Sequence, residues 1–271
     1  MNRVARETGA PESGETTVDR LTDFAVQLAD AVRPVVRRHF RSRIAIETKA
    51  DASPVTLADR EAETTARDLI GDTFPDHGIV GEEFGALHED AEHVWIIDPI
   101  DGTKAFITGK PLFGTLIALQ RAGVPTIGVI DMPALDERWI GVAGKPTTFN
   151  GQTAATRPCP SLSEALLATT TPDMFVGENE AAFARIRSGV GACHYGGDCY
   201  NYALLASGFL DLVVEAQLQT YDFMALVPVI AGAGGIVTDW QGRPLGPASD
   251  GRVVAAGDRR IHAAAVERLN A

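Results

Sequence analysis

The order of its hydrophobic patterns is the feature that most limits what this chain can fold into. Apolar residues recur at helical spacing over residues 18–40 and again over 57–74. From residue 93 the pattern changes to short β-rich runs: VWII, GTLIALQR, TIGVIDM and RWIGVA, with AGVP as a turn between two of them. Strand and helix patterns then alternate to the C-terminus. This order predicts an α+β fold of layered sheets and helices, rather than a single doubly wound sheet.

The chain is expected to form two halves behind a short tail. Residues 1–17 are polar and lack the apolar block of a secretory signal, so they are predicted to be a disordered tail. Glu7, Glu12 and Glu15 argue against an organelle presequence, so a cytoplasmic location is expected. The segment RPCPSLS marks the seam between an N-terminal α+β half, 18–156, and a C-terminal α/β half, 157–271. In the second half, DFMALVPVIAGAG (222–234) predicts one continuous helix.

Composition excludes several classes of protein. The three cysteines show no CxxC spacing and the six histidines form no HExxH pattern, so neither a disulfide framework nor a zinc site is expected. No apolar stretch approaches the roughly 20 residues that a membrane helix needs. The formal net charge of −12 repels polyphosphate backbones, so nucleic-acid binding is disfavoured. A chain this acidic that handles a small anion needs a local positive charge, which a bound cation would supply.

The segment WIIDPIDGTKAF places two aspartates three positions apart, directly after an apolar run. Pro99 stiffens the turn that carries Asp98 and Asp101. Two carboxylates held this close repel each other unless a cation lies between them. Magnesium takes oxygen ligands, and the main-chain carbonyl of Ile100 can join the set. The segment therefore predicts a site for a hard divalent cation.

The residues that follow add the parts of a phosphate site. Gly102 permits close approach of the backbone to a ligand, and TKAFITG predicts a short helix whose free N–H groups face an anion. Thr103 adds a hydroxyl beside the cation. The phosphoaspartate mechanism of the haloacid dehalogenase type needs a DxDGT pattern, and DPIDGT is one residue longer. We therefore favour direct attack by metal-activated water.

Other acidic residues follow strand or loop patterns, and each also has a simple structural explanation. Asp59 and Asp222 precede apolar helical runs, where aspartate commonly caps the helix. Glu82 and Glu83, in GIVGEEFG, have the spacing of solvated loop charges. Taken one by one, these residues do not require a site.

Two signatures change that interpretation. WIIDPIDGT with GEE upstream, and YDFMALVPVIAGAGG downstream, resemble the inositol monophosphatase superfamily of magnesium-dependent phosphomonoesterases. Tyr221 stands where many members have Trp. The resemblance extends from about residue 22 to the C-terminus. It implies a layered αβαβα sandwich of the inositol monophosphatase and fructose-1,6-bisphosphatase type, and a homodimer.

The resemblance also implies a role for each matching residue. Two or three Mg²⁺ ions would be held by Glu82, Asp98, the carbonyl of Ile100, Asp101 and Asp222. Asp59 and Thr103 would orient and deprotonate the attacking water. The N–H groups of Gly102 and Thr103 would cradle the phosphate, and Lys49 lies in the family's mobile lid.

Within the superfamily, FITGKPLFGTLIALQRAGVPTIGVID and GGDCYNYALLASGFLDLVVEA resemble the histidinol-phosphate phosphatases. Histidinol carries an ammonium group, whereas myo-inositol is neutral. Asp198 and Glu215 match positions that face the substrate in relatives, and two carboxylates there would pair with an ammonium. The alternatives are that Asp198 caps the helix that follows it and that Glu215 only accepts a hydrogen bond from a hydroxyl.

The leading hypothesis is a magnesium-dependent phosphomonoesterase that hydrolyses L-histidinol phosphate, a small-molecule phosphate ester, in histidine biosynthesis. One alternative is an inositol-1-phosphate or broad-specificity phosphatase of the same superfamily. A second is a metal-dependent binding protein with a decayed site. The presence of Asp59 and Thr103 speaks against decay, because a binding protein does not need a water-activating pair.

Overall fold

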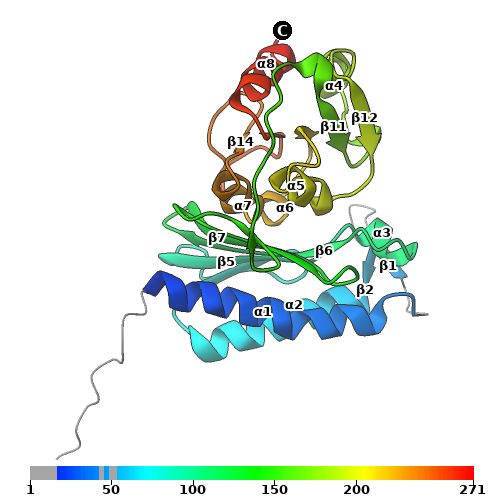
Figure 1. Cartoon of the computed structure of the whole chain (residues 1–271). Helices are drawn as coiled ribbons and strands as arrows, with labels where there is room; N and C mark the ends of the chain where they lie inside the picture. The colour runs from blue at the N-terminus through cyan, green and yellow to red at the C-terminus, as the bar shows by residue number, and fades with distance from the viewer. Residues whose placement is uncertain (1–16, 43–45, 49–53) are drawn as a thin grey trace, which may run out of the picture.

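The computed structural model describes residues 17–42, 46–48 and 54–271 (Figure 1). Lys49 and the predicted tail, apart from Thr17, lie outside these ranges. The helices are α1 (Thr17–His39), α2 (Leu57–Thr73), α3 (Thr103–Ile107), α4 (Glu178–Arg187), α5 (Cys199–Ala206), α6 (Thr220–Phe223), α7 (Leu226–Gly232) and α8 (Arg259–Leu269). Short 3₁₀ helices span Leu162–Glu164 and Pro172–Met174. Within the described part, no helix is both long enough and apolar enough to cross a membrane.

The strands form one small and two large sheets. β1 (Ile46–Thr48) pairs with β2 (Pro54–Thr56). The eight-stranded sheet, in the order β10-β9-β8-β7-β6-β5-β3-β4, contains β3 (Gly78–Gly81), β4 (Gly85–Leu87), β5 (His93–Asp101), β6 (Gly114–Arg121), β7 (Val124–Met132), β8 (Glu137–Val142), β9 (Thr148–Phe149) and β10 (Gln152–Thr153). The five-stranded sheet, in the order β12-β11-β13-β15-β14, contains β11 (Leu166–Thr169), β12 (Ala192–Tyr195), β13 (Leu212–Glu215), β14 (Ile236–Thr238) and β15 (Val253–Ala256).

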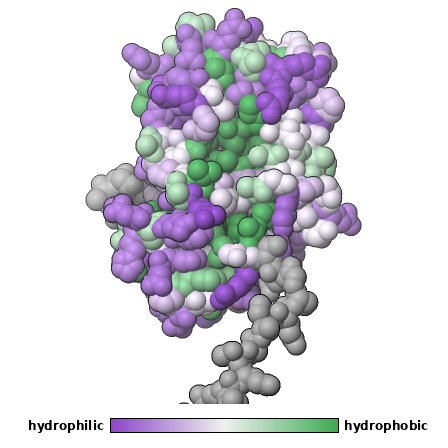
Figure 2. Space-filling model, turned by 90° about the vertical axis from the view of Figure 1, so that its left-hand side faces the viewer, coloured by the Kyte–Doolittle hydropathy of each residue, from purple (hydrophilic) through white to green (hydrophobic). Residues whose placement is uncertain are grey.

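These elements stack in five layers, αβαβα, which confirms the predicted fold class (Figure 1). Helices α1 and α2 cover the outer face of the eight-stranded sheet, and α5, α6 and α7 lie between the two sheets. Helices α4 and α8 pack together on the far side of the five-stranded sheet. On the face in Figure 2, hydrophobic residues gather mainly around the middle of the molecule, and hydrophilic residues predominate toward its two ends.

The outer helices form where the periodicity predicted them. In α1, the buried face carries Leu21, Phe24, Leu28, Val32 and Val36. The ring of Phe24 lies edge-on to Trp95 of β5, with centroids 5.3 Å apart. This apolar contact fixes the helical layer against the strand that ends in the DPIDGT segment.

The single helix predicted over 222–234 is wrong, because two helices occupy this stretch. Helix α6 ends at Phe223 and α7 begins at Leu226. Pro228 lies in the first turn of α7 and has no N–H to bond back to residue 224, so it fits the start of a new helix. The break leaves Asp222 in the short helix α6, which packs against β5.

Strand β14 was not predicted from the sequence.

Candidate active site

A bulge at the end of β5 carries the two aspartates of DPIDGT. Asp98 pairs with Leu116 and Asp101 with Gly114, so β5 has one more residue than β6 over this stretch. Pro99 lies in the bulge, where its missing N–H disturbs no regular ladder. The Ile100 N–H donates to Oδ1 of Asp98 at 3.0 Å. The extra residue turns Asp98 and Asp101 toward one site.

Three aspartates from two distant segments converge there. One carboxylate oxygen each from Asp98, Asp101 and Asp222 lie within 4.8 Å of one another. Asp222 is held by the Gln219 N–H, which donates to its Oδ2 at 2.6 Å. Asp101 is held by the Cys199 N–H, which donates to its Oδ2 at 2.6 Å. The N-terminal ends of α5 and α6 therefore orient two of the three carboxylates.

Glu82 lies near Asp98 of this cluster and also near Asp59 of α2. Parallel pairing of β3 and β5 sets Gly81 beside Ile97, and the Glu82 N–H donates to the Ile97 carbonyl at 3.3 Å. Burial is the largest cause of the raised pKa values of Asp98 and Asp59. The nearby negative charge of Glu82 raises both pKa values further.

Asp59 caps helix α2 with one of its two carboxylate oxygens. Its Oδ2 accepts hydrogen bonds from the N–H of Thr56 at 2.8 Å and from the hydroxyl of Thr56 at 2.6 Å, which completes a capping box. Its Oδ1 is buried and has no hydrogen-bond partner among the described residues. Because a buried oxygen without a partner is costly, this atom is suited to a water or cation that the pocket would hold.

A bound cation would stabilise the ionised form of these three carboxylates. Burial and the neighbouring acids raise the pKa of Asp98 and of Asp101 well above their usual range, and raise the pKa of Asp222 to about 7. Within the described chain, no lysine or arginine forms an ion pair with these three residues. An oxygen-only set of this kind fits a hard divalent ion such as Mg²⁺.

Gly102 and Thr103 lie next to the carboxylates. Gly102 has φ +86°, and a Cβ there would lie 3.1 Å from both Cγ of Asp198 and the carbonyl oxygen of Leu112. The Thr103 hydroxyl donates to the Ile100 carbonyl at 3.1 Å. The pocket that these residues line also includes Glu82, Asp198 and Asp222.

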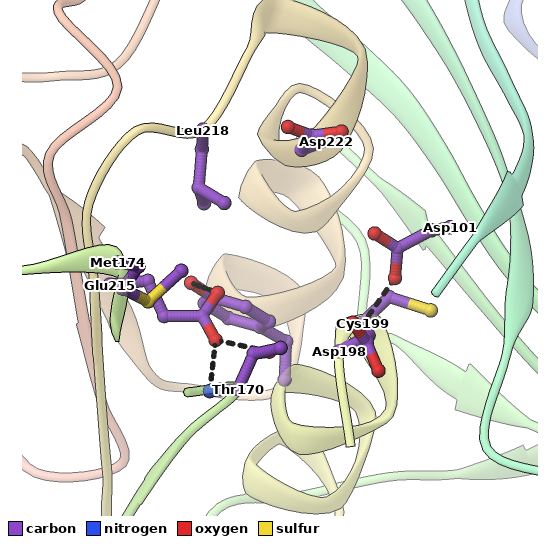
Figure 3. Close-up of a pocket in the computed structure, with 9 residues that line it drawn as sticks. Asp101, Thr170, Met174, Asp198, Cys199, Glu215, Leu218 and Asp222 are labelled. Atoms are coloured by element: carbon purple, nitrogen blue, oxygen red, sulfur yellow. Dashed lines mark hydrogen bonds between the residues drawn. The ribbon is translucent and has the colours of Figure 1, made fainter. Parts of the chain in front are cut away.

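A deeper pocket extends from the cluster toward β13 (Figure 3). Glu215 lies on the side opposite Asp101 and Asp198. Its Oε1 accepts from the N–H of Thr170 at 2.8 Å and from the hydroxyl of Thr170 at 2.7 Å, and its Oε2 accepts from the Tyr202 hydroxyl at 2.9 Å. Burial raises its pKa to about 7, although the hydrogen bonds oppose this shift.

Asp198 lies at the N-cap position of α5, but its side chain makes no capping hydrogen bond. The capping alternative for Asp198 is therefore wrong. Its backbone has φ 46°, which is uncommon outside glycine. Burial raises its pKa to about 6, while the charges of Lys104 and Lys110 oppose this shift. Positive charge therefore lies near Asp198.

Comparison with known proteins agrees with this geometry. The model of the inositol monophosphatase family matches residues 17–271. The chain belongs to the inositol monophosphatase family. The predicted resemblance is thus confirmed, and the protein is a phosphatase of this metal-dependent family.

Relatives of this inositol monophosphatase family member cover nearly all of its length. It is 51% identical over 267 residues to the bifunctional phosphatase IMPL2, chloroplastic, of Arabidopsis thaliana, which covers 95% of this chain and 77% of that one. It is 35% identical to a histidinol-phosphatase of Mycobacterium tuberculosis, with 92% and 97% covered. A solved inositol monophosphatase from Zymomonas mobilis has a TM-score of 0.88 and 47% identity, with 95% and 100% covered.

Several residues of this family member's pocket were not identified from sequence. Thr170 and Met174 line it from the segment after β11, and Leu218 lines it from the loop after β13. Tyr202 is buried, and its hydroxyl donates a hydrogen bond to Glu215. No local pattern marks these residues, because the pocket forms only when β11, β13 and α5 come together.

The raised pKa values give a testable pH dependence. In the folded, metal-free enzyme, Asp222 has a pKa of about 7, and burial and the neighbouring acids hold the pKa of Asp98 and of Asp101 well above the usual range. A cation must displace these protons, so Mg²⁺ affinity should fall as pH is lowered from about 8 to about 6. Each displaced proton adds about a tenfold rise in apparent Kd per pH unit. Isothermal titration with Mg²⁺ at three pH values would measure this change in apparent Kd. An affinity independent of pH would contradict this electrostatic description.

Proposed function

We propose that this phosphatase is a magnesium-dependent phosphomonoesterase that releases phosphate from L-histidinol phosphate. The observation that carries the proposal is the convergence of Asp98, Asp101 and Asp222 beside a pocket that ends at the buried acid Glu215. Two or three Mg²⁺ ions would be held by Glu82, Asp98, the Ile100 carbonyl, Asp101 and Asp222.

The chain's own residues then have distinct tasks. Bound Mg²⁺ supplies Lewis-acid activation of water and stabilises charge on the phosphate and leaving group. Asp59 accepts the proton of the attacking water through Oδ1, which has no hydrogen-bond partner in the described part of the chain, and burial raises the pKa of this carboxyl as a base requires. Thr103 orients the same water with its hydroxyl. The N–H groups of Gly102 and Thr103 bind the phosphate oxygens.

Glu215 supports histidinol phosphate over a neutral ester. Its three hydrogen-bond partners are all donors, so they orient it as an anionic acceptor. An ammonium group would add a charge-assisted hydrogen bond in a buried place. Relatives named histidinol-phosphatase at 34% and 35% identity support the same substrate. Asp198 is a second proposed contact for the ammonium group, although the positive charges of two nearby lysines already act on it.

Steady-state kinetics on a substrate panel tests this proposal. We expect kcat/KM for histidinol phosphate to exceed that for inositol 1-phosphate by about tenfold or more, since a hydrogen bond to a charged group contributes about 1.5–3 kcal/mol. Phosphate release should require added Mg²⁺. Fructose 1,6-bisphosphate and adenosine 3′,5′-bisphosphate complete the panel.

A preference for inositol 1-phosphate would favour the alternative, an inositol or broad-specificity phosphatase. No release of phosphate in either the presence or the absence of Mg²⁺ would favour the binding-protein alternative. The homodimer and the cytoplasmic location stay predictions; the Arabidopsis relative is named as chloroplastic.

A further inference from the structure

Glu63 is a fully buried carboxylate that contacts the turn after β3. It lies in α2 and is 0% exposed. Its Oε2 accepts from the Glu83 N–H at 2.7 Å, and its Oε1 accepts from the Phe84 N–H at 3.2 Å. The Nε of Arg67, one helical turn further on, donates to Oε1 at 2.7 Å. The carboxylate therefore ties α2 to the backbone of residues 82–84, here named the 82–84 turn.

The packing around this contact is close. A Cβ on Gly81 would lie 2.0 Å from Oε1 of Glu63, so the carboxylate occupies the space that any larger residue would need. Arg67 also donates to the carbonyl of Gly85, and its guanidinium lies 5.9 Å from the centroid of the Phe84 ring. Helix α2 thus bonds the two N–H groups in the turn and the carbonyl of the residue after it, which leaves the backbone that follows Glu82 little freedom.

Glu82 is the first residue of this turn. We propose that Glu63 is a positioning residue for the cation site, because it fixes the backbone from which the Glu82 carboxylate reaches Asp98. The inference rests on the metal ligands proposed above. Glu63 also lies four residues after Asp59, so both carboxylates are on one face of α2. A single helix then positions the water-activating acid directly and a cation ligand through the turn.

Mg²⁺ binding without substrate provides the test. Glu63→Gln keeps the shape of the side chain but replaces one acceptor oxygen by an NH₂ group that faces donors. We expect Mg²⁺ affinity, measured by isothermal titration, to fall by about 10- to 100-fold, as is usual when a partner of a metal ligand is changed. The matched control is Glu61→Gln on the same helix, which loses contacts with Arg38 and His39 and should bind Mg²⁺ as the wild type does.

Two further variants separate positioning from other effects. Glu63→Asp keeps the charge but is one methylene too short to reach the turn, so it should weaken binding as Glu63→Gln does. In a double-mutant cycle, Glu63→Gln should change affinity less than about twofold once Glu82→Gln is present, because the two residues act in series. Circular dichroism and melting of the metal-free variants would verify that each is folded.

The outcomes are distinct. Wild-type affinity in Glu63→Gln or Glu63→Asp would overturn the inference, and so would an equal loss from Glu63→Gln with and without Glu82→Gln. Wild-type affinity in Glu82→Gln would instead overturn the proposed metal ligands, and the inference with them.

Discussion

Replacing Asp98 with Asn should lower kcat/KM by on the order of 10³-fold or more, equivalent to about 4 kcal/mol, for any phosphate ester that the wild-type enzyme hydrolyses. The Ile100 N–H donates to Oδ1 of Asp98. An asparagine that keeps this hydrogen bond must point its NH₂ group at the cation site. The variant therefore loses both a negative charge and a ligand oxygen. Phosphate release at saturating Mg²⁺ measures the effect.

The stability of the same variant should change in the opposite direction. Asp98 is 2% exposed, and this burial is the largest cause of its raised pKa. The negative charges of Glu82, Asp101 and Asp222 raise the pKa further. Acids whose folded pKa is raised stabilise the fold most when they are protonated. Without metal, this stability is present below about pH 4 and is lost as pH rises through the raised pKa values of the folded cluster, which for Asp222 is about 7. In EDTA near pH 8, Asp98→Asn should melt at the same temperature as the wild type or higher.

The pair of measurements separates a lost metal ligand from a damaged fold. Asp136→Asn serves as the control, because its side chain is 70% exposed and forms ion pairs with Arg33 and Arg37 rather than with a residue of the cluster. It should retain activity. Full activity in Asp98→Asn would contradict the metal scheme, and a large drop in its metal-free melting temperature would mean that the inactive variant is damaged rather than relieved of repulsion.

The fold was largely predictable because its main elements are locally encoded. The buried face of α1 repeats at helical spacing, and the strands from β5 to β8 form continuous β-rich runs. The DPIDGT segment is local as well: the aspartates and the bulge lie within four residues. For this reason the position of Asp98 and Asp101 at a strand end could be inferred before the structure was known.

Contacts between distant segments were not predictable in the same way. The side chain of Glu63 reads as one acid among several in a helix, and only the packing of α2 on β3 brings it to the 82–84 turn. Likewise, Tyr202 has the pattern of a core residue, and its hydroxyl meets Glu215 only once α5 lies against β13. A single amino-acid sequence does not show which distant residues will form such contacts.

The proposed recognition of a substrate amine depends on one such contact. Glu215 is 2% exposed and, among the described residues, accepts its hydrogen bonds from Thr170 and Tyr202 alone. A buried carboxylate without a cation is costly, which is why burial raises its pKa to about 7. An ammonium group placed in this pocket would restore the anionic form and gain a charge-assisted hydrogen bond.

Glu215→Gln should therefore abolish the preference for the amine rather than activity in general. The matched ligand is the phosphate ester of 3-(imidazol-4-yl)propanol, which keeps the ring and the ester but lacks the ammonium. We expect the wild type to favour histidinol phosphate over this analogue by about 10- to 100-fold in kcat/KM, and the variant to treat the two alike. The ratio of the two kcat/KM values cancels any change in Mg²⁺ binding that both substrates share.

Tyr202→Phe is the control for hydrogen bonding without a change of charge. It removes one donor to Glu215 but leaves the carboxylate and both donors of Thr170, so most of the preference should remain. If Glu215→Gln lowered kcat/KM equally for histidinol phosphate and the analogue, Glu215 would shape the pocket without contacting the amine. In that case Asp198, on the other side of the pocket, would be the carboxylate to vary next.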